Sequence, residues 1–403
     1  MSAAPKYESK VPPRVMEYLH AAIFWGGLGL LVYIYAGYAV VLHILSRLMP
    51  VDHSADDSHR PSVTILFSAR NEEMALPEKL ESLRRIDYPP DKLQILAASD
   101  ASTDRTNEIL ANCPFLECLI LDTHAGKNAA LNALLPKAKG EILFYTDANT
   151  VLHPDCVKTA VRHFHDLRAG AVVGQLIFSH EKEWNPVGRG TGLYWRYENG
   201  LKRAESRLGA VLVGGGSLLL ARRRFIDALD PRIANDLEIP ARVGAAGYYV
   251  FFEEQCVGFE KPHASVGEEL RRTSRIVARG LRGFWVLLPV MIKTPFRLWE
   301  FLSHKFLRWF TLPLALAVFI CAWFLREQTF PLFVFYAGLL WLAGSLIGLG
   351  WMRRASAPRW TRPFTLLAQF LIMHAAAVWG LVRALAGQTP STWQVPQSTR
   401  EKS

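Results

Sequence analysis

Four long stretches without charged side chains limit what this chain can fold into. The first, residues 18–46, contains no Lys, Arg, Asp or Glu. It exceeds the roughly 20 apolar residues that a helix needs to cross a bilayer. It is also too long for a signal peptide, and no small-residue cleavage site follows it. We therefore expect a retained transmembrane anchor at residues 18–49, behind an N-terminal tail of residues 1–17.

Three more uncharged stretches lie near the other end, at residues 310–325, 329–352 and 363–382. Three such stretches in sequence are typical of membrane spans rather than of buried helices in a soluble core. The sequence therefore predicts an integral membrane protein with three transmembrane helices in residues 310–385 and a C-terminal tail of residues 386–403.

The formal net charge of +10 comes from basic residues that gather beside these stretches. Between the last two lie Arg353, Arg354, Arg359 and Arg362. Loops rich in Arg and Lys stay on the cytoplasmic side, so we place this loop inside. By alternation, the part before residue 310 is inside and the N-terminus outside; the C-terminus is outside too unless one span is miscounted. No nucleic-acid-binding module accompanies the charge, and we expect no nucleic-acid partner.

After a polar linker at residues 50–60, strand and helix patterns alternate. Strands are predicted at residues 62–68, 93–98, 116–121 and 142–146, with a further strand near 171–178. Helices are predicted to open at residues 69–73, to run from Arg105 and from Gly126, and to cover 155–170. This alternation indicates a largely parallel sheet, in which ligands bind at the edge formed by the carboxyl ends of the strands.

Polar residues follow each predicted strand at that edge, namely Asn71, Asp100, Lys127 and Asp147. The alternatives are a helix-capping turn at Asp147, an N-cap supplied by Ser102 or Thr103 beside Asp100, and a solvated lysine at a helix start for Lys127. The convergence of the four residues on one edge favours a phosphate-bearing ligand over unrelated capping turns. Neither G-x-G-x-x-G nor a P-loop is present, which disfavours a dehydrogenase or a P-loop NTPase.

Seven short motifs recur in order along the chain. They are ARNEE at residues 69–73, SDASTD at 99–104, GKN at 126–128, TDAN at 146–149, GGGS at 214–217, ND at 235–236 and RRTSR at 271–275. In their order and spacing the chain resembles the family 2 glycosyltransferases, more closely the membrane-embedded branch of cellulose, hyaluronan and poly-N-acetylglucosamine synthases. The resemblance implies an α/β fold with a GT-A-like domain at residues 61–280, whose mixed, mainly parallel sheet is inserted between transmembrane helices. It also implies a bacterial inner membrane location.

Such a family uses a nucleotide-diphosphate sugar, usually linked to uridine diphosphate. The resemblance assigns donor binding to Asn71, Glu73, Asp100, Lys127, Asp147, Arg272 and Arg275. It also implies a divalent cation, Mg²⁺ or Mn²⁺, bound by Asp147. Many relatives have a second Asp two residues later, whereas this chain has Asn149. A neutral amide oxygen can still coordinate a hard cation, or the second ligand comes from elsewhere.

One-step inversion at the anomeric carbon needs a single carboxylate to accept the proton of the acceptor hydroxyl. By resemblance this base is Asp236, with Glu238 as the rival carboxylate and a helix cap as the alternative role for Asp236. Gly215, Gly216 and Ser217 are predicted to lie against the donor sugar or the acceptor, because glycine allows close approach to the backbone.

Arg272, Arg275, Arg279 and Arg282 are spaced to share one helical face. Residues 281–309, rich in Trp, Lys and Arg, suit amphipathic helices at the membrane surface. The family motif here ends in Arg-Trp, whereas this chain has Arg275 and Ile276, which leaves processive synthesis open.

The leading hypothesis is transfer from a UDP-sugar to a growing polysaccharide, with export along the spans and an unidentified export partner. The alternatives are addition of one sugar to a lipid-linked acceptor or glycolipid, and a catalytically degenerate transferase-like scaffold or export component.

Overall fold

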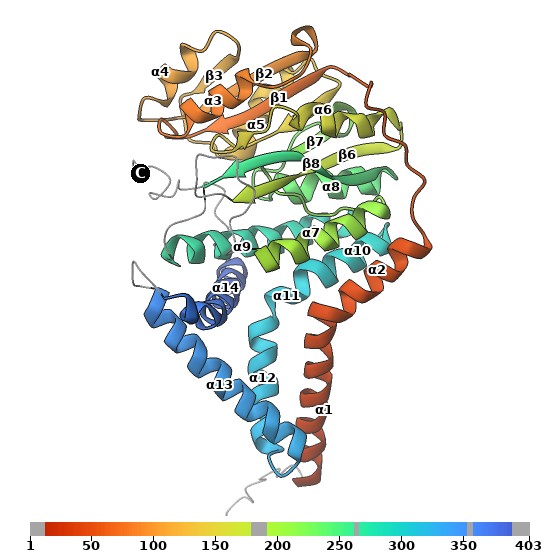
Figure 1. Ribbon diagram of the computed structural model, residues 1–403, viewed down its shortest axis with the longest axis vertical. Coiled ribbons are helices and arrows are strands. Elements are labelled where there is room, and N and C mark those ends of the chain that lie inside the picture. The colour runs from red at the N-terminus through yellow and green to blue at the C-terminus, as the bar shows by residue number, and fades with distance from the viewer. Residues whose placement is uncertain (1–12, 179–191, 262–265, 353–357, 389–403) are drawn as a thin grey trace, which may run out of the picture. The chain divides into compact units, whose positions relative to one another are not determined.

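The computed structural model describes residues 13–178, 192–261, 266–352 and 358–388 (Figure 1). The chain forms two compact units, one of residues 1–38 and 303–379 and the other of residues 39–302 and 380–403. The predicted tails fall mostly outside the described residues, as do Arg353 and Arg354 of the predicted cytoplasmic loop.

The second unit is built on one eight-stranded sheet, whose first half is parallel. Its strands are β1 (Val63–Ala69), β2 (Leu93–Asp100), β3 (Glu117–Leu121) and β4 (Ile142–Tyr145). They lie in the order β3-β2-β1-β4. Side chains of β1 alternate between two cores, with Ile65 and Phe67 in one and Leu66 in the other, because successive residues face opposite sides of a strand. All four predicted strands are thus present.

The other half of the sheet reverses direction three times, at the β4–β7, β7–β6 and β8–β5 pairs. Its strands are β5 (Val151–Leu152), β6 (Ala169–Phe178), β7 (Leu219–Arg222) and β8 (Tyr249–Glu260), in the order β7-β6-β8-β5 beyond β4. Strand β7 runs antiparallel to β4 and to β6, and β8 runs parallel to β6. Consequently β6 and β8 end at the same edge as β4, and β7 begins there. The sheet is mixed, as expected.

Helices connect and cover the strands (Figure 1). They are α3 (Leu76–Arg84), α4 (Thr106–Ala111), α5 (Lys127–Leu134), α6 (Cys156–Val161), α7 (Gly192–Arg207) and α8 (Asn235–Ala245). Two predictions were wrong in extent. Residues 70–75 form a turn rather than a helix, with Asn71 at a φ of 52°. The long helix predicted over residues 155–170 stops after α6 and a short 3₁₀ turn, because β6 already begins at Ala169.

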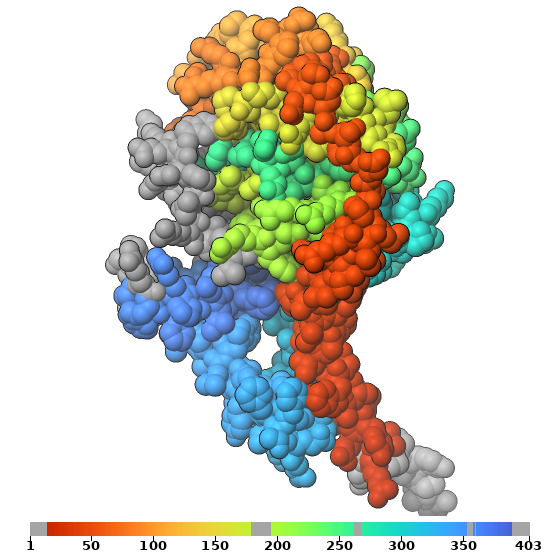
Figure 2. Space-filling model, turned by 45° about the vertical axis from the view of Figure 1, so that its right-hand side comes forward, coloured from red at the N-terminus to blue at the C-terminus, as the bar shows by residue number. Residues whose placement is uncertain are grey.

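The linker contacts the domain that follows it in the chain. Figure 2 shows residues 51–60 lying along the surface of the second unit. The backbone N–H of Asp56 donates to the carbonyl of Arg162 (3.1 Å). The rings of His53 and His163 are joined by a 2.7 Å hydrogen bond between Nε2 and Nδ1, and His163 Nε2 contacts Glu253.

After β8 the chain becomes helical. The α-helices are α9 (Val266–Met291), α10 (Pro295–Phe301), α11 (Leu307–Trp309), α12 (Thr311–Phe324), α13 (Thr329–Met352) and α14 (Arg362–Leu385). Near the N-terminus lie α1 (Pro13–Val32) and α2 (Tyr38–Leu48), joined by a π-helical turn. Three helical segments are long and apolar enough to cross a membrane: residues 14–48, 329–352 and 362–385. A fourth would be residues 295–324, which bend by 63° at the start of α12.

Candidate active site

The loops after β1 and β2 are tied together by two of the predicted donor-binding residues. Asn71 Oδ1 accepts a hydrogen bond from the backbone N–H of Thr103 (2.7 Å). Glu73 Oε2 accepts one from the backbone N–H of Arg105 (3.1 Å). Both side chains therefore shape the edge where β1 and β2 end.

Asp100 is buried at the end of β2, with 1% of its surface exposed. Its carboxylate accepts hydrogen bonds from the backbone N–H groups of Ala125 (2.7 Å) and Gly126 (2.9 Å), and His124 Nδ1 lies 2.7 Å from Oδ2. These contacts fix the turn that precedes α5. A direct contact of Asp100 with a nucleotide base stays a prediction.

Lys127, the first residue of α5, forms an ion pair with Asp147 at the end of β4. The same Nζ lies 3.4 Å from the carbonyl oxygen of Gly216. Ser217 Oγ lies within hydrogen-bond distance of the other carboxylate oxygen of Asp147 (3.1 Å). The structure thus brings together four residues predicted from three separate motifs.

Three residues that the sequence analysis did not select extend this cluster inward. Glu260, at the end of β8, accepts hydrogen bonds from Ser217 Oγ (2.7 Å) and Thr150 Oγ1 (2.6 Å). Lys79 Nζ is completely buried and donates to Thr146 Oγ1 and to the Thr150 carbonyl, both at 2.9 Å. Burial and the Asp147 carboxylate raise the pKa of Glu260.

Asp236 lies in the first turn of α8, beside the glycine run. Its carbonyl accepts a hydrogen bond from the N–H of Gly214 (3.1 Å). A methyl group on Gly216 would lie 3.8 Å from Cβ of Asp236 and 3.5 Å from Lys127 Nζ. A methyl group on Gly215 would meet nothing within 4 Å. The predicted base and the Lys127–Asp147 pair therefore flank the same backbone segment.

The rival carboxylate, Glu238, has a different environment. It is fully buried, accepts hydrogen bonds from the backbone N–H of Asp230 (3.0 and 3.2 Å) and forms an ion pair with Arg242. Burial raises its pKa. Glu238 is therefore engaged in holding the loop before α8, and this role favours Asp236 over Glu238 as the base.

Helix α9 turns two arginines toward this region. Burial, together with the charges of Arg279 and Arg272, lowers the pKa of Arg275 to about 10, while the Asp147 carboxylate opposes that shift. Arg279 donates to the carbonyl of Ile233 (2.5 Å), and the charge of Asp236 acts on it. Arg282 is exposed, so the predicted stripe of arginines divides between the domain and solvent.

The oxygen atoms at this edge fit a hard divalent cation. Asp147, Ser217 and Glu260 offer carboxylate and hydroxyl oxygens, the ligands that Mg²⁺ and Mn²⁺ prefer. Among the described residues no group of three or more His, Cys, Asp or Glu side chains could hold a metal alone. A cation held by Asp147, Ser217 and Glu260 would take its remaining ligands from diphosphate oxygens and water.

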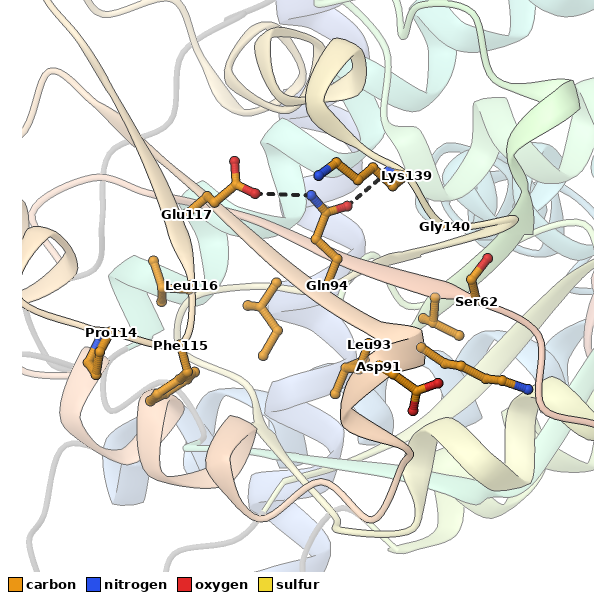
Figure 3. A pocket seen from close by; sticks show the side chains of 13 residues that line it. Ser62, Asp91, Leu93, Gln94, Pro114, Phe115, Leu116, Glu117, Lys139 and Gly140 are labelled. Carbon is orange, nitrogen blue, oxygen red and sulfur yellow. Dashed lines mark hydrogen bonds between the residues drawn. The ribbon is translucent and has the colours of Figure 1, made fainter.

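A surface hollow of about 410 Å³ lies at the opposite edge of the sheet, where β1 and β2 begin (Figure 3). Gln94 lines it, with Nε2 donating to Glu117 (3.3 Å) and Oε1 accepting from the N–H of Lys139 (2.8 Å). Because ligands of α/β sheets bind at the carboxyl edge, this hollow is not part of the candidate site.

The sheet and the residues at its carboxyl edge are compatible with a glycosyltransferase, and the sequence comparisons agree. Residues 64–229 match the family described as Glycosyl transferase family 2. The chain therefore carries a family 2 glycosyltransferase domain.

Three curated relatives carry related names. An N-acetylglucosaminyltransferase of Bradyrhizobium diazoefficiens is 30% identical over 175 residues, which are 42% of this chain and 36% of that protein. The probable glycosyltransferase YdaM of Bacillus subtilis is 26% identical over 221 residues, 50% and 51% of the two chains. A beta-monoglucosyldiacylglycerol synthase of Nostoc sp. is 28% identical over 193 residues, 45% and 41%. The chain thus spans about half or less of these relatives.

Among solved structures, the mannosyltransferase PcManGT from Pyrobaculum calidifontis, in complex with GDP-Man and Mn²⁺, superposes with a TM-score of 0.66 at 22% identity. The match covers 93% of this chain and 99% of that one. It confirms the expected GT-A-like fold.

Proposed function

We propose that this protein is a membrane-bound, inverting glycosyltransferase that moves a sugar from a nucleotide-diphosphate donor to an acceptor at the membrane surface. The observation that carries the proposal is the arrangement around Gly216, where the Lys127–Asp147 pair and Asp236 approach one stretch of backbone. Charge for a diphosphate and a base for a hydroxyl are the two requirements of a one-step transfer.

Each group has a chemical role in this proposal. Lys127, Arg272 and Arg275 attract and orient the diphosphate. A bound Mg²⁺ or Mn²⁺ would supply further positive charge against the departing nucleotide, held by Asp147. Asp236 accepts the proton of the acceptor hydroxyl as the hydroxyl oxygen bonds to the anomeric carbon, and the bond from that carbon to the diphosphate breaks, which releases the nucleotide diphosphate. The donor is proposed to be a UDP-sugar; the GDP-Man complex of the structural neighbour makes guanosine the first competitor to test.

Membrane attachment is supported by the apolar helices and by exposed apolar side chains near the end of α9 and in α10. Trp285, Ile292 and Phe296 are exposed there, a pattern that suits a membrane surface. We place the catalytic domain on the cytoplasmic side of a bacterial inner membrane, from the positive charge of the predicted loop.

Two acceptors remain in competition. A growing polysaccharide, exported with or without a partner protein, is the first. A lipid-linked acceptor or glycolipid is the second. Ile276 favours the second, because it replaces the aromatic residue of polymer synthases and is half exposed on α9. A glycolipid synthase among the relatives supports the same acceptor.

The test uses the purified chain in lipid, with labelled UDP- and GDP-sugars and Mg²⁺ or Mn²⁺. A ladder of products indicates a polysaccharide, and a single lipid-mobile product indicates one transfer. Asp236→Asn should slow transfer by about 10²- to 10⁴-fold and keep donor affinity, because it removes the base but not the diphosphate site.

Asp227→Asn, an exposed carboxylate of the preceding loop, is the matched control and should behave as wild type. Equal product formation by wild type and Asp236→Asn would exclude this base. Absence of transfer from every donor, with no nucleotide binding, would favour the scaffold or export alternative.

A further inference from the structure

The candidate cation site lacks the second acid that its sequence motif normally supplies. Asn149 is neutral and partly buried, and within the described part of the chain its side chain makes no hydrogen bond. A carboxylate from a distant part of the sequence, Glu260, lies at the same place. It arrives there because β8 ends at the edge where β4 ends, and because Val151 of β5 pairs with Phe259.

Asp147 and Glu260 share one hydroxyl group. Ser217 Oγ is 3.1 Å from Asp147 Oδ2 and 2.7 Å from Glu260 Oε1. A serine hydroxyl has one hydrogen to donate, so it can satisfy only one of the two carboxylates at a time. Both carboxylate oxygens therefore lie next to the same hydroxyl group, where a positive charge would stabilise both acids.

Among the described side chains Asp147 has an ion-pair partner and Glu260 has none, although the charges of Arg272 and Lys79 act on Glu260 without an ion pair. Lys127 pairs with Asp147. In the described part of the chain Glu260 forms no ion pair, and its partners are the hydroxyls of Ser217 and Thr150. Leaving a carboxylate unpaired beside another is unfavourable, whereas a divalent cation between them would neutralise both.

We propose that Glu260 is a carboxylate ligand of the divalent cation, together with Asp147, and that it replaces the acid missing at position 149. This inference rests on the proposed function, because the cation serves the nucleotide diphosphate. The hydroxyls of Thr150 and Ser217 act as positioning groups, since they hold one Glu260 oxygen in a fixed place.

Binding of Mn²⁺ alone and with UDP or GDP, followed by electron paramagnetic resonance on the purified full chain, tests the assignment. Loss of a group that hydrogen-bonds to a metal ligand lowers metal affinity by about 10- to 100-fold. Glu260→Gln removes a direct ligand and should weaken Mn²⁺ binding by at least that factor. Asn149→Asp should strengthen it, and Glu260→Gln with Asn149→Asp should recover most of the lost affinity. Glu254→Gln, on the same strand and paired with Arg203, is the control and should bind Mn²⁺ as wild type does.

Other results of the Mn²⁺ binding measurements would contradict particular parts of this proposal. If Glu260→Gln lowers the melting temperature but keeps Mn²⁺ affinity, Glu260 is only a structural anchor and the proposal is wrong. If Asn149→Asp does not restore the Mn²⁺ affinity that Glu260→Gln loses, Glu260 does not replace an acid at position 149. Unchanged Mn²⁺ affinity in Asn149→Asp would also count against the site, even if Glu260→Gln failed to fold. If the wild-type chain binds neither UDP nor GDP, the proposed function itself is wrong. If it binds a nucleotide but does not bind Mn²⁺, only the cation site is wrong.

Discussion

Lys79 shows how the candidate site is built on the core beneath it. Its ammonium group is completely buried and has hydroxyl and carbonyl partners, and no carboxylate of the described residues forms an ion pair with it. Desolvation lowers the pKa of Lys79 to about 7, although the charges of Cys156, Asp147 and Glu260 oppose this. Its two bonds join Thr146 to Thr150 and so fix the turn that carries Asp147.

The lowered pKa of Lys79 predicts a pH-dependent stability. In the unfolded chain its pKa is about 10.4, so between pH 7 and 10 the unfolded state binds a proton that the folded state does not. Stability from this group therefore rises with pH across that window, by about 1.4 kcal/mol per unit, and is lost as the pH falls toward 7. In Lys79→Met this dependence should disappear, so the melting temperature of the variant relative to wild type should fall between pH 7 and 9.5.

Metal-free protein in EDTA is used, because a bound cation would change the charge near Lys79. Lys137→Met, which removes an exposed lysine, should differ from wild type by a constant amount. A Lys79→Met difference that is equally constant would show that the amine stays charged in the folded state.

Residue patterns reveal chemistry at strand ends only when the strands themselves can be recognised. Asp147 and Lys127 were predictable, because Asp147 directly follows a clear strand and Lys127 begins the helix after another. Glu260 was not predicted, although it ends the long strand β8 just before the arginine-rich helix. Its position depends on two reversals of strand direction and on the two-residue strand β5, which has no periodicity to detect.

At the scale of elements, the parallel strands and the apolar helices followed from hydrophobic runs. Two helix boundaries were predicted wrongly, because the backbone conformation and hydrogen bonds of local turns decide where these helices begin or end. Asn71 tolerates a left-handed conformation and delays α3 to Leu76. The residues after His165 leave the helical pattern because Asp166 binds Arg168 and its backbone, which forms a turn into β6.

Helices α13 and α14 pack through glycines, so we expect a larger residue at a contacting glycine to destabilise the protein more than the same residue at a glycine away from the contact. Gly344 and Gly348 are four residues apart and face α14. A methyl group on Gly348 would lie 2.0 Å from the carbonyl oxygen of Phe364, so the backbones themselves are in contact. Gly348→Leu should separate the helices and destabilise the protein by about 1–3 kcal/mol or more.

Gly350, two residues later, is the matched control because a methyl group there meets nothing within 4 Å. Gly350→Leu should change stability by no more than about 0.5 kcal/mol. Thermal unfolding in detergent, followed by size-exclusion chromatography, compares the two variants. Equal melting temperatures would mean that α13 and α14 are not packed at Gly348.

At the scale of the whole molecule, the number of spans decides on which side each loop lies. Helix α12 has 14 residues and is about 21 Å long, less than the roughly 30 Å of a bilayer core. It crosses only if the bent segment before it contributes to the same span. With that span, the turn around Gln328 is outside and the loop at Pro358 is inside, as the positive charge of that loop requires.

Single cysteines at the two loops test this topology. Gln328→Cys and Pro358→Cys are both at exposed positions, whereas Cys113, Cys156, Cys256 and Cys321 are buried and Cys118 is partly buried. In intact cells a membrane-impermeant maleimide should label Gln328→Cys but not Pro358→Cys, and permeabilised cells should show both. Wild type measures the background from Cys118. The reverse pattern in intact cells would mean that α12 does not cross, in which case the arginine-rich loop would lie outside and the positive charge would not set the orientation of this chain.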